Sequence, residues 1–356
     1  MELKNNIQKQ VSLCYKKQNM KRKNLNAKKL KDSIFKDKKI SKIYSKLNLT
    51  TKNTKSFLAA ISGGSDSMAL ALLSKVLKDE KNKRVYFVHV DHAIRKNSSK
   101  EALQLKNILK KHQIDLKIIK NKKNIQKNIQ KNARDTRYQI LCDFCKKNNI
   151  KSLVTAHHKD DQIETFLIRL SRGSGVEGLS SMSESTKLNY GIKLLRPFLK
   201  FRKEELQIIS KKFFKKVIKD PSNKNKKFLR TNIRELTKIL RKKGIEPDQI
   251  YRSIENISST KKAINFYVKQ SLKKFVKFKK RETILDFNMF QKEPADVKFK
   301  IINTIVKNRA ASYYPPRAKK VLSLINRFRS KSTQKSTLGG CIFEKRKNFV
   351  HVTKEF

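Results

Sequence analysis

The chain has 356 residues, enough for two domains, and no apolar run reaches the roughly 18 residues that span a bilayer, so we expect no membrane partner. Its 88 basic and 29 acidic residues leave a net charge of +59, which favours a polyanion and makes nucleic acid the first candidate partner. Abundant lysine without tryptophan is also typical of AT-biased coding, and we attribute the charge to both causes.

The N-terminal segment, residues 1–30, is polar and lysine-rich, and we expect a mobile basic tail that either touches RNA or is merely solvated. It has no apolar segment typical of a secretory signal, although an organelle-targeting peptide is compatible with so basic a terminus. Four scattered cysteines do not suit a disulfide framework, so we expect a cytoplasmic protein in a reducing compartment.

A phosphate-binding loop is predicted where a buried strand runs into a helix. The apolar residues 58–61 lead into a turn of small residues, and a helical apolar pattern begins at Met68. Glycine lets the backbone pass close to a phosphate, and free N–H groups of the first helical turn point at it. The turn consists of Ser62, Gly63, Gly64, Ser65, Asp66 and Ser67. Its serines add hydroxyl donors, Asp66 is a candidate magnesium ligand, and the ending of a Walker loop is absent.

Strands and helices alternate after this loop. Buried strands are expected at 58–61, 85–90, 116–119, 152–156 and 194–198. Their spacing by helices is typical of an α/β fold with a doubly wound, mostly parallel five-stranded sheet and flanking helices. Ligands of such sheets bind beyond the carboxyl ends of the strands. The loop at 62–67, the Asp91-His92 pair and residues 157–161 should therefore meet in one cleft.

A smaller, mainly helical C-terminal domain is expected to follow the α/β part, because the pattern is helical from residue 248 onward. We divide the chain into the tail at 1–30, an α/β domain at 31–225, a basic linker helix at 226–246 and a helical domain at 247–356. The last of these could end in a hairpin formed by 338–343 and 349–352.

Residues 155–165 carry acidic side chains at the start of a helix. Asp161 and Glu164 are three residues apart and share a face, and His157 stands at the preceding strand end. Carboxylates near a phosphate site can hold magnesium or bind a cationic substrate, whereas acids also stabilise a first helical turn without any further role. We prefer the functional interpretation for Asp161 and Glu164, and simple capping for Asp160.

Arginines 134 and 137 lie on one face of the predicted helix at 126–147. A guanidinium group suits phosphate or carboxylate recognition, although such a pair is often only solvated. Because lysine dominates elsewhere in the chain, the use of arginine here favours a functional interpretation.

These motifs in their order resemble the tRNA(Ile)-lysidine synthetase family, part of the ATP-pyrophosphatase superfamily whose loop signature is Ser-Gly-Gly-x-Asp-Ser. The resemblance is strong over residues 57–236 and weaker beyond. It rests on residues 62–67, 90–95, 133–138, 155–165, 172–175, 178–179, 196–198, 220–223 and 228–234, and on 315–317 and 337–340.

The resemblance implies an enzyme that uses ATP to adenylate the C2 oxygen of the wobble cytidine in tRNA(Ile) with a CAU anticodon. The ε-amino group of L-lysine then attacks C2 and expels AMP, which leaves lysidine. The resemblance further implies that residues 62–67 bind ATP, that Asp66 binds Mg²⁺, and that the catalytic domain is the one at 31–225. Whether the enzyme is a homodimer stays open.

The resemblance also implies which side chains surround lysine and the reacting cytosine, namely Arg137, Asp161, Glu164 and Arg230. The ε-amine must lose a proton before it attacks. Asp161, Glu164 and His157 are the alternative proton acceptors, and the sequence does not choose among them.

Two other functions are compatible with parts of the sequence. A tRNA thiolase of the same superfamily would use cysteines, and Cys142 and Cys145 are three residues apart. They lie inside a predicted helix without a second such pair, so we interpret them as small core residues. A non-catalytic RNA-binding protein with a decayed site is disfavoured by the intact loop and by the acidic motif at 157–164.

Overall fold

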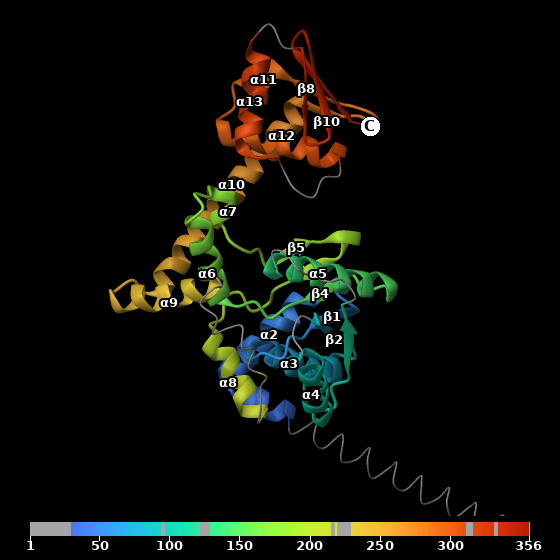
Figure 1. Cartoon of the computed structure of the whole chain (residues 1–356), viewed down its shortest axis with the longest axis vertical. Helices are drawn as coiled ribbons and strands as arrows, with labels where there is room; N and C mark the ends of the chain where they lie inside the picture. The colour runs from blue at the N-terminus through green and yellow to red at the C-terminus, as the bar shows by residue number, and fades with distance from the viewer. Residues whose placement is uncertain are drawn as a thin grey trace, which may run out of the picture. The chain divides into compact units, whose positions relative to one another are not determined.

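The computed structural model describes residues 30–93, 97–121, 129–214, 218, 229–310, 316–330 and 334–355. Apart from Leu30, the expected basic tail lies outside this described part. The chain divides into two compact units, with the division between Ile254 and Glu255. Figure 1 shows the two units along the colour gradient from blue to red and labels their helices and some of their strands.

The first unit is built on a six-stranded sheet with the order β3-β2-β1-β4-β6-β5. Its strands are β1 (Ser56–Ala60), β2 (Arg84–Asp91), β3 (Leu116–Lys120), β4 (Ser152–Val154), β5 (Ser185–Lys187) and β6 (Lys193–Leu195). All neighbouring pairs are parallel except β5 with β6. The predicted α/β fold with a mostly parallel sheet is confirmed, but the sheet has six strands and not the five that we predicted. The short edge strand β5 escaped prediction because its residues Ser-Thr-Lys are all exposed and carry no apolar pattern.

Helices cover both faces of this sheet, as the doubly wound prediction requires. Successive strand side chains point to opposite faces. Phe57 and Ala59 of β1 therefore enter one apolar cluster with residues of α2, α3, α4 and α8, whereas Leu58 enters another with residues of α5. The helices of the unit are α2 (Lys38–Thr50), α3 (Ser65–Lys81), α4 (Ser98–Lys111), α5 (Ile129–Lys147), α6 (Lys159–Leu170), α7 (Val176–Leu179), α8 (Lys203–Phe213) and α9 (Leu229–Lys242).

The strand order fixes where a ligand binds. The chain leaves β1 toward β2 and β3 on one side, and returns through β4 and β6 on the other side of β1. The carboxyl ends of β1 and β4 therefore flank the point where the strand order reverses, which is the usual ligand position in open α/β sheets. Residues 62–67 follow β1 and residues 155–161 follow β4.

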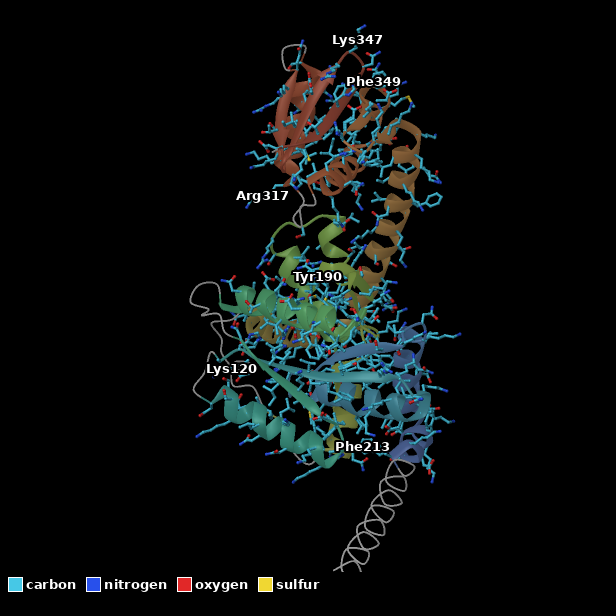
Figure 2. The ribbon with its side chains drawn as sticks, turned by 90° about the vertical axis from the view of Figure 1, so that its right-hand side faces the viewer. Lys120, Tyr190, Phe213, Arg317, Lys347 and Phe349 are labelled. Atoms are coloured by element: carbon cyan, nitrogen blue, oxygen red, sulfur yellow. The ribbon has the colours of Figure 1, made fainter. Side chains whose placement is uncertain are left out.

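The edge of the sheet is held against α5 by polar contacts. A short 3₁₀ turn, Asn189–Gly191, connects β5 to β6 and carries Tyr190, which Figure 2 labels. The Lys146 ammonium lies 4.6 Å from the centre of the Tyr190 ring, and Gln139 donates to the Tyr190 hydroxyl at 3.3 Å. The exposed strand is thereby fixed without an apolar core of its own.

The second unit combines helices with a five-stranded antiparallel sheet in the order β7-β8-β11-β10-β9. The strands are β7 (Val276–Phe278), β8 (Thr283–Asp286), β9 (Lys335–Leu338), β10 (Cys341–Arg346) and β11 (Phe349–Lys354). The helices are α11 (Phe287–Gln291), α12 (Ala295–Ala310) and α13 (Ala318–Arg329), and the long α10 (Pro247–Phe275) contains the division between the units.

The core of this second unit lies between the sheet and the helices, with Ile301, Leu324 and Phe343 all buried in one cluster. The expected terminal hairpin is β10 with β11, but it is only part of a larger sheet. The sequence pattern did not reveal the remaining strands β7, β8 and β9, because each has only three or four residues and β7 and β9 are also mostly exposed. Within the described ranges of both units, no helix is long and apolar enough to cross a membrane.

Candidate active site

The phosphate loop has the backbone that its glycines predict. Gly63 has a φ of +92°, which L side chains rarely adopt. The Ser67 hydroxyl closes the turn, because it accepts the N–H groups of Ser62 at 3.2 Å and Gly63 at 3.0 Å and donates to the Gly64 carbonyl at 2.9 Å. Gly64 caps α3 without a side-chain hydrogen bond. The N–H groups of the first turn are therefore available to an anion.

His158 links this loop to α6, and it is a residue to which the sequence analysis gave no role. The ring is 3% exposed, its Nε2 lies 3.6 Å from Asp66 and 3.5 Å from Asp161, and its Nδ1 lies 3.5 Å from Asp160. Burial by itself would lower the pKa of His158, but the three carboxylates outweigh it and raise that pKa to about 10. At neutral pH the raised pKa favours the charged ring, whose Nε2 faces Asp66 and Asp161, while its Nδ1 lies 3.5 Å from Asp160 and 3.4 Å from the Asp161 N–H at the helix N-cap.

The three aspartates around His158 are held in place in different ways. Burial would raise the pKa values of Asp66 and Asp160, yet His158 lowers both, and the pKa of Asp160 falls to about 2. Asp160 also accepts the Lys203 N–H at 2.8 Å, at the start of α8. Asp161 accepts the His158 N–H at 3.1 Å and so caps its own helix. The expected meeting of the phosphate loop with residues 157–161 is confirmed, since Asp66 and Asp161 face one ring nitrogen.

The Asp91-His92 pair ends β2 on the other side of β1. Asp91 accepts the Ala93 N–H at 2.9 Å and the Ser99 hydroxyl at 2.8 Å, so it shapes the turn toward α4. Burial lowers the pKa of His92, and the nearby Arg137 guanidinium lowers it further. His89 of the same strand lies 2.8 Å through Nδ1 from the Ile61 carbonyl, which anchors the residue just before the loop.

Glu164 lies one turn further along α6 and is paired with arginines of α9. It is 5% exposed, and its carboxylate lies 2.6 Å from Arg234 Nε and 3.6 Å from Arg230 Nε. Burial would lower the pKa of Arg234, but Glu164 outweighs it and raises that pKa. Arg234 was not among the predicted site residues. Its spacing of four residues from Arg230, which places both on one helix face, was the signal that could have found it.

His157, next to the charged His158, is neutral. Burial lowers its pKa well below the ordinary value, and the guanidinium groups of Arg196, Arg134 and Arg137 push it in the same direction. Its Nδ1 lies 2.8 Å from the Thr155 hydroxyl. A neutral imidazole can accept a proton, whereas the imidazolium of His158 cannot.

Arginines 134 and 137 lie near the ring of Tyr138, at 5.4 and 5.5 Å from its centre. Burial lowers the pKa of Arg137, with Arg134 and Arg230 adding to the effect. The predicted substrate residues therefore form connected groups, since Arg230 contacts Glu164 and acts electrostatically on both Arg137 and His157.

The acidic side chains of the site are candidate ligands for a metal ion. Among the described residues there is no group of three or more His, Cys, Asp or Glu side chains that could hold one. Mg²⁺ in nucleotide sites is usually bound by one or two carboxylates together with phosphate oxygens and water. Asp66 and Asp161 fit that requirement for an ion that arrives with ATP, and they do not fit a site made of protein ligands alone.

The cysteine pair on α5 lies in the core. Cys142 and Cys145 are buried as free thiols in the apolar cluster that contains Leu58 and Val88. Burial raises their pKa values to about 11 and about 12, so both stay protonated at neutral pH.

Comparison with known proteins places these motifs in a family. Residues 34–240 match the PP-loop domain family. The chain is 35% identical over 301 residues to the tRNA(Ile)-lysidine synthase of Wolbachia pipientis wMel, which covers 83% of this chain and 70% of that protein. It is 30% identical over 314 residues to the synthase of Orientia tsutsugamushi, covering 83% and 69%.

Among solved structures, the U34-tRNA thiolase of Methanococcus maripaludis is similar with a TM-score of 0.49 and 19% identity, covering 62% of this chain and 80% of that one, a likeness too weak to bear on function. The sequence relatives and the PP-loop match are much stronger. This chain therefore belongs to the tRNA(Ile)-lysidine synthase family, the tRNA-modifying ligases that carry an ATP-binding PP-loop domain.

Proposed function

We propose that this enzyme joins L-lysine to C2 of the wobble cytidine of tRNA(Ile) with a CAU anticodon, through an adenylated cytidine, and releases AMP and pyrophosphate. The observation that carries the proposal is the pairing of Asp66 and Asp161 with one nitrogen of His158. It joins the ATP loop to the helix whose acids suit a cationic substrate, so both half-reactions can share one site.

In the first half-reaction the cytidine C2 oxygen attacks the α-phosphorus of ATP, and the bond to the β-phosphate breaks. Pyrophosphate leaves with additional negative charge. The Ser67 hydroxyl binds the N–H groups of Ser62 and Gly63 and so fixes the turn before α3, which leaves the N–H groups of the first turn of α3 positioned to stabilise that charge without reorganising. Mg²⁺ bound with ATP would be held by Asp66 and would supply further positive charge there.

In the second half-reaction the lysine ε-amine attacks C2, and AMP leaves with the bonding electrons. The amine must first give up a proton. We assign that proton to Asp161, because the arginines that keep His157 neutral also make it a weak base, and Glu164 is already engaged by Arg234 and Arg230. The same carboxylate attracts the cationic amine before it is deprotonated.

The RNA must present its cytosine outside the anticodon stack, as other base-modifying enzymes require. The net charge of +59 supports binding of the tRNA backbone. The buried, protonated Cys142 and Cys145 give no support to the rival thiolase function.

The test is one assay with purified protein, ATP, labelled L-lysine and a transcript of the CAU isoleucine tRNA. We expect label in the RNA only when ATP is present. A methionine tRNA transcript, which has the same anticodon, is the matched control and should stay unlabelled. RNA that takes up no lysine, or takes up sulfur from a thiol donor instead, would refute the proposal.

A further inference from the structure

A second group of cations surrounds Tyr138, and the half-reactions above do not use it. Arg134 comes from α5, Arg169 from the end of α6, and Arg196 follows β6 directly. Burial lowers the pKa of Arg196, and the charges of Arg134 and Arg169 lower it further. No carboxylate is among the strongest electrostatic neighbours of Arg196 or of His157. Glu177 offsets part of the charge of Arg169, and the positive charge that remains is concentrated around Arg196.

Arg196 is held firmly and yet keeps one donor unused. It is 5% exposed, and its Nη1 donates to the Ser183 carbonyl at 2.8 Å and to the Thr186 hydroxyl at 2.9 Å. Its Nε, however, is buried without a hydrogen-bond partner. The Tyr138 hydroxyl is also buried, and its hydrogen-bonding interaction with the Arg196 and Arg137 guanidinium groups partly offsets the lowering of their pKa values. Arg196 Nε is thus a buried donor without a partner of its own, next to a hydroxyl in a positive environment.

Leaving buried donors unpaired is costly, and the cost disappears when a ligand supplies the acceptor. A guanidinium edge together with a hydroxyl matches the two oxygens of an oxyanion. Because Arg196 is buried, it is better suited to a small ligand than to an RNA backbone, which would contact more exposed side chains. Arg134 and Arg169 are only partly buried, so the positive charge of this group extends from the surface to the buried Arg196.

We propose that Arg196 Nε and the Tyr138 hydroxyl bind the α-carboxylate of the amino-acid substrate, with Arg134 and Arg169 supplying the surrounding positive charge. This inference rests on the proposed function, and it adds residues beyond Arg137, Asp161, Glu164 and Arg230. His157 is close enough to Arg196 for that charge to lower its pKa, and it lies in the segment between β4 and α6. The enzyme then recognises a free amino acid rather than any primary amine.

The experiment compares L-lysine with 1,5-diaminopentane, which is lysine without its carboxylate, at saturating ATP and tRNA. The variants are Tyr138→Phe, which removes only the hydroxyl, and Arg196→Lys, which keeps the charge but removes the Nε edge. We expect the KM for lysine to rise about tenfold or more in each variant, because hydrogen bonds to charged groups are worth at least that factor. Turnover of the diamine and the KM for tRNA should not change.

Matched controls are Tyr190→Phe and Arg172→Lys, two exposed residues whose variants should behave as the wild type. An unchanged preference for lysine over the diamine in Tyr138→Phe would overturn the inference, whatever the stability of Arg196→Lys. A rise in the KM for tRNA with an unchanged lysine preference would instead assign the oxyanion to an RNA phosphate and also overturn it. If the wild type modifies RNA with neither amine, the proposed function fails first and this inference fails with it.

Discussion

His158 Nε2 lies 3.6 Å from Asp66 Oδ2, so a buried imidazolium at the start of α6 is paired with the carboxylate of the ATP loop at the start of α3. The same ring faces Asp160 and Asp161. One side chain therefore holds together the parts of the molecule that would bind ATP and lysine.

Replacing this ring should both destabilise and inactivate the enzyme. In His158→Asn three carboxylates lose their shared cation, and breaking a buried ion pair from one side costs about 3–5 kcal/mol. The free energy of unfolding in urea measures the loss. The control is His351→Asn, whose more exposed ring pairs with Glu282 at 2.9 Å and should contribute much less. Equal losses in the two variants would contradict the central role of His158.

Stability should also fall as the solution becomes alkaline. The pKa of His158 is raised from 6.5 to about 10 in the folded protein. Its stabilisation is therefore fully present below pH 6.5 and is lost as the pH rises through 10. The total loss is on the order of 5 kcal/mol, since each unit of pKa corresponds to about 1.4 kcal/mol. Urea unfolding of the wild type and His158→Asn at about pH 6.5, 8 and 9.5 tests this, because the variant should lack the downward slope.

Asp161→Asn should stop lysidine formation while tRNA binding survives. The amide keeps the size of the side chain but cannot attract the lysine ammonium, and we expect turnover to fall at least about 100-fold. Labelled lysine incorporation gives the turnover, and filter binding gives the affinity for tRNA. The exposed Asp115, in the turn before β3, is the matched control as Asp115→Asn. Near-normal turnover of Asp161→Asn would remove it from the substrate site.

The pair Glu164 and Arg234 should show strong coupling in a double-mutant cycle. Glu164→Gln removes the carboxylate that Arg234 faces, and Arg234→Met removes the nearer of the two arginines from the buried Glu164, so each should cost about 1–3 kcal/mol. The double variant should lose clearly less than the sum of the two. Arg241 and Glu246, an exposed pair at 3.5 Å, serve as the control cycle and should show almost no coupling. Additive effects at Glu164 and Arg234 would show that their contact is not energetically linked.

Binding of tRNA should weaken steeply with salt, since neutralised phosphates release counterions on association. With at least about four phosphate contacts, the logarithm of the affinity should fall with the logarithm of salt concentration at a slope of about −3 or steeper. Filter binding between about 50 and 200 mM salt measures the slope. An affinity that does not change with salt would mean that the +59 charge is compositional and not functional.

The features that could be predicted from the sequence are local ones. The loop at 62–67 and the buried strands are visible because their residues are adjacent or periodic in the chain. The pairing of Glu164 with Arg234 was not predictable in that way, since the two residues are 70 positions apart. His158 was overlooked for the same reason, because its partner Asp66 is on another helix. Strand β5 was missed because exposed polar strands carry no apolar signal.

The contrast between His157 and His158 has a consequence for chemical labelling. The two residues are adjacent in sequence, but at neutral pH the His157 ring keeps an unprotonated nitrogen whereas the His158 ring is protonated on both. Reagents that acylate imidazole attack only the unprotonated ring, so they should modify His157 and spare its neighbour. Protection of that one histidine, read by mass spectrometry as each substrate is added, would report the order in which the site fills, without any need to follow catalysis.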